Sequence, residues 1–98
     1  MEDIKRKIKK IESEHLLKLV KEYEKHDIKK LYRIYDKIDF EINNNKLEHD
    51  KSSKIIERYK KHKVCYDLDT IEGKLLILKA IKTIVNNKDI KVENKYKG

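Results

Sequence analysis

Apolar residues recur along this chain with the period of an α-helix, and they are densest between Thr70 and Val85. At 100° per residue, Ile71, Leu75 and Leu78 share one face, and six further apolar residues widen it until only a narrow polar stripe remains. A helix that is apolar on nearly every side is normally buried among its neighbours. The segment is too short and too rich in lysine to cross a bilayer core about 30 Å thick. The pattern therefore predicts a buried helix at the centre of the fold.

Both ends of this predicted helix carry residues that suit a helix terminus. Asp69, followed three residues later by Glu72, matches a capping box, in which the two side chains bond free amides of the first turn. Asn86 and Asn87 predict the end of the helix, because asparagine tolerates the left-handed conformation found there. Gly73 lies in the first turn, where glycine costs about 1 kcal/mol relative to alanine. We interpret Gly73 as a point where another part of the backbone approaches closely.

Two further helices are predicted in the first half of the chain. Residues 3–25 place apolar side chains at the helical period, with lysine and glutamate on the opposite face. Asp27 suits the N-cap of a second helix over residues 28–42. The single break at His26 and Asp27 favours a hairpin of these two helices over one bent rod. Residues 43–45 are asparagines and predict a turn, because asparagine accepts left-handed geometry and bonds its own backbone.

A third helix and a minor β element are predicted around the central helix. Ser52 or Ser53 can cap a helix over residues 54–63. Residues 64–68 and 90–93 instead alternate along the chain with the period of a β-strand, so the first segment is either an extended connector or a short strand. If these two segments pair, they form a small two-stranded element that needs the helices behind it for stability.

Composition narrows the fold class. With 98 residues, the chain is expected to be a single domain over residues 1–98, ending in a loose basic tail at 94–98. It has no proline and two glycines, which disfavours a sheet-rich fold with tight hairpins and excludes glycine-rich phosphate loops. The sequence therefore predicts an all-α or mostly α domain of four helices, with the fourth helix buried.

Cysteine usage and hydropathy bear on location. Cys65 is the one cysteine, which excludes an internal disulfide and fits a reducing compartment. The N-terminal ten residues are charged from position 2 and have no apolar signal core. No apolar run reaches 18 residues. We expect a cytoplasmic protein without a membrane partner.

The charge balance favours an anionic partner. The chain carries 26 Lys and Arg against 18 Asp and Glu, a net charge of +8. The excess concentrates near the N-terminus and along the third predicted helix, whose outer side could lie against phosphates and release counterions. We therefore predict nucleic-acid binding, DNA or RNA, mainly through the phosphate backbone. The residues predicted to contact phosphates are Lys54, Arg58, Lys60, Lys61 and Lys63, supported by Lys5, Arg6 and Lys9.

Three other interpretations of these segments stay open. The third helix can be the recognition helix of a helix-turn-helix, although its turn is long and polar for that motif. Tyr32 and Tyr35, which lie among basic residues, can stack bases of a single strand, but tyrosines at core spacing more often pack their rings inside. The long apolar stripe of residues 3–25 also predicts a homodimer through the first helix, which is compatible with nucleic-acid binding because two copies double the positive charge. Without a nucleic-acid role, the same stripe predicts a protein–protein interaction or homodimerisation module.

Catalytic and metal sites have little support in the sequence. His62 and Cys65 have the spacing of one ligand pair, whereas a structural zinc site needs two such pairs. Asp67 and Asp69 could hold magnesium beside a phosphate, but Asp69 is more simply a helix cap. We therefore predict a non-catalytic protein with no cofactor and no metal.

Overall fold

The computed structural model describes residues 2–44, 46–63 and 65–97, with side chains from residue 3 to residue 88. Its helices are α1 (Glu2–Tyr23), α2 (Ile28–Asn44), α3 (Ser52–His62) and α4 (Ile71–Lys97). The fold is all-α, as predicted. The expected two-stranded element is not present in the described residues: residues 65–68 form no strand, residues 90–93 are part of α4, and residue 64 lies outside the described ranges.

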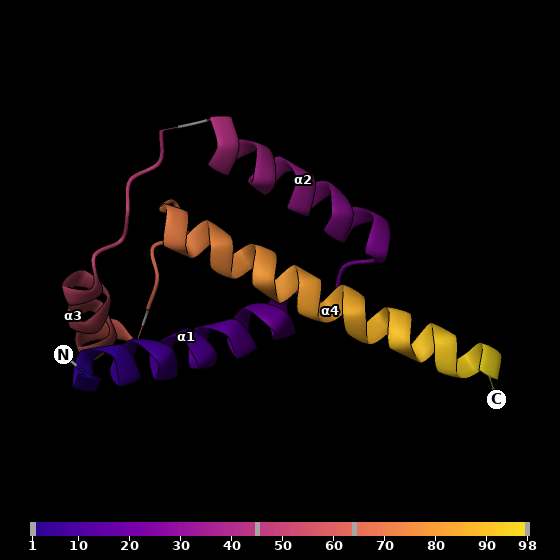
Figure 1. Cartoon of the computed structure of the whole chain (residues 1–98), viewed down its shortest axis with the longest axis horizontal. Helices are drawn as coiled ribbons and strands as arrows, with labels where there is room; N and C mark the ends of the chain where they lie inside the picture. Colours follow the sequence, from indigo (N-terminus) through magenta and orange to yellow (C-terminus); the bar gives the residue numbers. More distant parts are fainter. Residues whose placement is uncertain (1, 45, 64, 98) are drawn as a thin grey trace.

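Helix α4 is the centre of the arrangement (Figure 1). It packs against α1 on one side and against α2 on the other, while α3 lies against α1 at the end where the chain begins. The molecule measures 48 × 30 × 23 Å along its principal axes. None of the described helices combines the length and the apolar character that crossing a membrane requires.

The core confirms that the fourth helix is the most buried. Half of the buried apolar residues come from α4, and the others from all three remaining helices and the segment before α4. Ala80 and Ile81 are 0 % and 1 % exposed, and they belong to the same buried cluster as Leu31 of α2 and Leu19 of α1. Each fully buried leucine or isoleucine stabilises the fold by about 1.5–3 kcal/mol. Leu75, expected on the inward face, is instead 50 % exposed.

The start of α4 differs from the predicted capping box. The hydroxyl of Thr70 accepts a hydrogen bond from the amide of Gly73 at 3.3 Å, which makes Thr70 the cap. The carboxylate of Glu72 instead accepts a hydrogen bond from the amide of Asp50 at 2.6 Å. The prediction for Asp69 and Glu72 was therefore wrong, because the partner of Glu72 is 22 residues away in the sequence.

Gly73 is a point of close backbone approach, as predicted. A β-carbon at this position would lie 2.7 Å from the carbonyl carbon of Asp67 and 2.7 Å from Cα of Leu68. Carbon atoms in contact normally stay about 3.5–4 Å apart. Any side chain at residue 73 would therefore push the preceding loop away from α4.

The asparagines that were predicted to end α4 and to follow α2 in a turn lie mostly inside these helices. Helix α4 continues through Asn86 and Asn87, and its backbone includes residues 94–97 of the expected tail, because no proline or glycine lies between residues 87 and 97. Asn43 and Asn44 belong to α2, and the predicted turn residue Asn45 lies outside the described ranges. An asparagine inside a helix costs under about 1 kcal/mol, which neighbouring helical residues readily offset.

The caps of α2 and α3 differ in how well the sequence predicted them. The carboxylate of Asp27 accepts a hydrogen bond from the amide of Lys30 at 2.8 Å, so its capping role is confirmed. For α3 the prediction was wrong, because Lys51 is the N-cap and no side chain bonds the first turn. Lys63 ends α3 in the left-handed conformation, with φ of 53°, and donates its amide to the carbonyl oxygen of Tyr59.

Candidate nucleic-acid interface

A buried carboxylate fixes the position of α3. Asp50 is 6 % exposed, and its two oxygens accept hydrogen bonds from the guanidinium of Arg58 at 3.0 and 3.2 Å and from the amide of Asp67 at 3.0 Å. Arg58 also donates to the carbonyl oxygen of Cys65 at 2.6 Å. Burial alone would raise the pKa of Asp50, but the hydrogen bonds from Arg58 and Asp67 outweigh it and lower the pKa.

The structure gives Arg58 a partner inside the protein. Its side chain is 26 % exposed and holds the loops on both sides of α3 together through Asp50 and Cys65. The pKa of Arg58 is raised, mainly by the hydrogen bond to Asp50. A phosphate would have to compete with this carboxylate, so Arg58 acts as a positioning residue for α3.

The predicted lysines of α3 are exposed to solvent. Lys54, Lys60 and Lys63 have no carboxylate partner among the described residues. Lys61 is 3.2 Å from Glu57 one turn earlier, an exposed pair that contributes under about 1 kcal/mol. Their ammonium groups therefore remain available to an anion in solution.

Helices α1 and α3 meet through a tyrosine. The hydroxyl of Tyr59 donates a hydrogen bond to the carboxylate of Glu14 at 2.6 Å. This contact places the N-terminal lysine cluster of α1 and the lysine cluster of α3 at the same end of the molecule (Figure 1). The two clusters are far apart in the sequence, and the fold brings them together.

Helical geometry determines which lysines of α1 lie on the same face as Glu14. Residues four or seven positions apart lie on the same face of a helix. The face of α1 that carries Glu14 therefore also carries Lys7, Lys10 and Lys18. All three are exposed. The predicted Lys5 and Lys9 are exposed too, but they lie at roughly 180° and 220° around the helix from Glu14. We call the surface formed by Lys7, Lys10 and Lys18 of α1 and by Lys54, Lys60, Lys61 and Lys63 at α3 the α1–α3 end. The prediction from sequence missed its three α1 lysines, although the helical period alone could have identified them.

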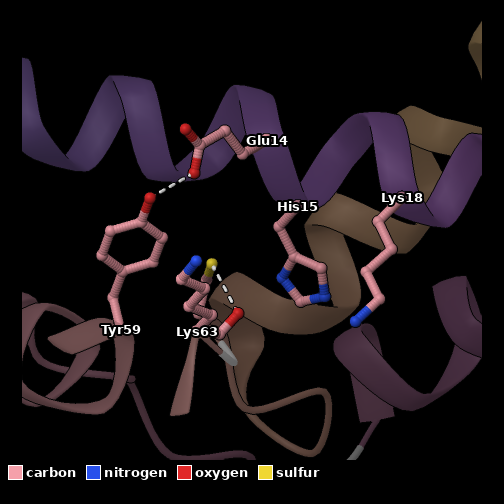
Figure 2. Close-up of a pocket in the computed structure, with 6 residues that line it drawn as sticks. Glu14, His15, Lys18, Tyr59 and Lys63 are labelled. Carbon is pink, nitrogen blue, oxygen red and sulfur yellow. Dashed lines mark hydrogen bonds between the residues drawn. The ribbon is translucent and has the colours of Figure 1, made fainter. Parts of the chain in front are cut away.

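A pocket of about 380 Å³ opens between the two helices (Figure 2). Its lining residues are Glu14, His15, Lys18, Tyr59, Lys63 and Cys65. The thiol of Cys65 donates weakly to the carbonyl oxygen of Lys63 at 3.8 Å, and burial raises its pKa. Because a nucleophilic cysteine needs a lowered pKa, the pocket lacks an activated thiol.

A second basic surface lies on α2. Its solvent-facing side contains a depression, whose lining residues are Asp27, Lys29, Lys30, Arg33, Ile34 and Lys37. Tyr35 is half-buried with the ammonium of Lys82 5.8 Å from its ring centre, which agrees with the packing interpretation of this tyrosine. Tyr32 is 49 % exposed. Helix α2 packs mainly against α4, so this surface provides a natural comparison for the α1–α3 end.

No three histidine, cysteine, aspartate or glutamate side chains within the described ranges come together in an arrangement suited to a metal ion. Comparison of the chain with protein-family models, with curated proteins and with solved structures finds no match. Any functional conclusion therefore depends on the geometry and charge of the surfaces described above.

Proposed function

We propose that this protein binds nucleic acid through the phosphate backbone, using the α1–α3 end as its contact surface. The observation that carries the proposal is the Tyr59–Glu14 hydrogen bond, which joins residues 45 positions apart and brings two lysine clusters to one end. The contacting residues are Lys7, Lys10 and Lys18 of α1 together with Lys54, Lys60, Lys61 and Lys63 at α3.

The electrostatics of this end favour phosphates. Glu14 accepts the Tyr59 hydroxyl and Glu57 pairs with Lys61, so these two carboxylates already have partners. Each phosphate that a lysine neutralises releases condensed counterions, which drives binding without reading the bases. The proposal is therefore for sequence-independent binding that weakens as salt rises.

Two earlier interpretations receive no support from the arrangement of helices. A helix-turn-helix needs its two helices packed together, whereas α2 and α3 lie apart (Figure 1). The apolar stripe of α1 is largely used inside the protein, where Ile11 and Leu19 are buried. The large apolar residues that α1 exposes, Ile4 and Leu17, lie about 220° apart around the helix and form no common patch. Base readout and a dimer through α1 are not part of the proposal.

A pair of matched variants tests the surface. The first variant replaces three lysines of the α1–α3 end by glutamine: Lys10, Lys60 and Lys61. The second variant replaces three lysines of α2 by glutamine: Lys29, Lys30 and Lys37. Both variants lower the net charge from +8 to +5. Fluorescence anisotropy with labelled single-stranded DNA, duplex DNA and structured RNA at about 50 mM salt gives the affinities.

We expect the first variant to bind at least about tenfold more weakly than wild type, and the second to bind within about threefold of it. All six lysines are exposed, so circular dichroism should show unchanged folding in both proteins. Equal losses in the two variants would mean that only the overall charge matters. A loss confined to the second variant would place the interface on α2. Either result contradicts the proposal.

A further inference from the structure

The pocket between α1 and α3 contains a histidine whose tautomer is fixed by the backbone. The amide of Tyr66 donates a hydrogen bond to Nδ1 of His15 at 3.3 Å. In the neutral imidazole one ring nitrogen accepts and the other carries the proton, so Nε2 of His15 is a donor. No group in the described ranges accepts a hydrogen bond from Nε2. Because no described side-chain atom is buried without a partner, Nε2 is in contact with the solvent of the pocket.

An ammonium group lies beside this donor. Figure 2 shows the side chain of Lys18 extending alongside the ring of His15 into the pocket. Burial, followed by the charge of Lys18, lowers the pKa of His15, while Glu22 on the same helix opposes the shift. Nε2 and the Lys18 ammonium are both donors, and no described protein group accepts a hydrogen bond from either. One anionic oxygen between Nε2 and the ammonium of Lys18 would satisfy both.

The remaining walls determine where such an anion can sit. Lys63 supplies a second ammonium from the end of α3, and no described carboxylate pairs with it. Glu14 is negative, but it lies toward Tyr59, whose hydroxyl it accepts. Cys65 and Tyr66 are neutral, since the pKa values of both are raised, that of Tyr66 to about 12. Figure 2 shows Lys63 near Tyr59 and Lys18 on the far side of the His15 ring, so Glu14 lies on the side of the pocket away from Lys18.

We propose that this pocket is a specific site for one phosphate group, held by Nε2 of His15 and the ammonium group of Lys18, with the charge of Lys63 in the same pocket in support. The volume of about 380 Å³ leaves room for the sugar to which the phosphate is attached. The group recognised is either a phosphate monoester at the end of a strand or a diester within it. This inference rests on the proposed function and adds one defined contact to an otherwise diffuse basic surface.

Nuclear magnetic resonance of the histidine ring tests the site directly. The pKa of His15 is measured in chloride and then with increasing inorganic phosphate at constant ionic strength, and a His15→Gln variant assigns its resonance among the four histidines. We expect a pKa below 6.5 in chloride and a rise with phosphate, because an anion beside Nε2 favours the protonated ring. An unchanged pKa in phosphate would overturn the proposal.

Matched lysine variants show whether the effect belongs to the pocket. Lys18→Gln should raise the starting pKa of His15, because the lysine charge lowers it, and should weaken the response to phosphate. Lys21→Gln removes an exposed charge from the same helix outside the pocket and should behave as wild type. Equal behaviour of the two variants would show that general charge, and not the pocket, causes the shift.

Oligonucleotides separate the two sources of phosphate and the two proposals. If the pocket takes a strand end, a 5′-phosphorylated strand binds more tightly than its 5′-hydroxyl counterpart, and Lys18→Gln removes the difference. If it takes a diester, Lys18→Gln weakens both strands equally. A phosphate response at His15 without binding of any oligonucleotide would keep the pocket and refute the proposed function. Oligonucleotide binding without a phosphate response at His15 would keep the proposed function and refute the phosphate site in the pocket.

Discussion

At the scale of single residues, Asp50 determines where the basic side chains of α3 lie. Three hydrogen bonds from Arg58 and the Asp67 amide offset the cost of burying its charge. These bonds join the loop before α3, the helix itself and the loop after it. The position of Tyr59, and through it the contact with α1, depends on this carboxylate.

Removing the partner of Asp50 should destabilise the protein strongly. Arg58→Met keeps much of the volume of the side chain but leaves a buried carboxylate without its charged partner, which costs about 3 kcal/mol. Urea denaturation followed by circular dichroism measures the free energy of unfolding. Lys60→Met, an exposed change on the same helix, should shift it by under about 0.5 kcal/mol. Similar values for the two variants would contradict the role given to Asp50.

The sequence could not have predicted this residue-scale network. Arg58 was predicted to contact phosphates because it lies in a basic run, and Glu72 to cap α4 because it follows Asp69 by three residues. Both interpretations used neighbours in the sequence, whereas the actual partners are 8 and 22 residues away. A long-range ion pair leaves no local pattern.

At the scale of elements, Gly73 allows the loop before α4 to lie directly on the helix. Thr70 caps α4 and its own hydroxyl donates to the carbonyl oxygen of Asp67 at 2.6 Å, which folds the loop back over Gly73. Helix α4 therefore begins with a tight backbone contact that no other residue type permits. This element boundary was predictable in part, because an unexplained glycine in a first turn suggests close approach.

Adding one methyl group at this contact should be costly. Gly73→Ala gains about 1 kcal/mol of helix propensity, yet its β-carbon would collide with backbone atoms of Asp67 and Leu68. We expect a net loss of at least about 2 kcal/mol in the free energy of unfolding. Thermal or urea denaturation measures it.

The control is another alanine substitution in the same helix. Asn86→Ala at an exposed position should stabilise the protein by a few tenths of a kcal/mol, because residue 86 lies inside α4 and not at its end. A stabilising Gly73→Ala would contradict the close approach. A destabilising Asn86→Ala would contradict the continuation of the helix.

Element types were easier to predict than their ends. The 3.6-residue period over α1, α2 and α4 extends over many residues, so local irregularities do not hide it. The alternation of residues 90–93 covers too few positions to distinguish a strand from the continuation of a helix. Asp27 was predicted correctly because its capping bond is local, reaching only to Lys30.

At the scale of the whole molecule, the proposed contact surface depends on how the helices pack. The absence of proline and the scarcity of glycine indicated an all-α fold from composition alone. Which helices meet depends on side chains distant in the sequence, so the meeting of α1 and α3 was not predictable. The same contact adds Lys7, Lys10 and Lys18 to the candidate residues, because they share the face of α1 from which Glu14 binds Tyr59.

The measurement that tests the central claim most directly is the salt dependence of binding by the wild-type protein. Fluorescence anisotropy with labelled single-stranded DNA, duplex DNA and structured RNA is compared at about 50 and 200 mM salt. Two or more phosphate contacts predict micromolar or tighter binding at low salt, and a loss of about tenfold or more at high salt. Absence of binding to all three probes at low salt would contradict the account, as would an affinity that salt does not change.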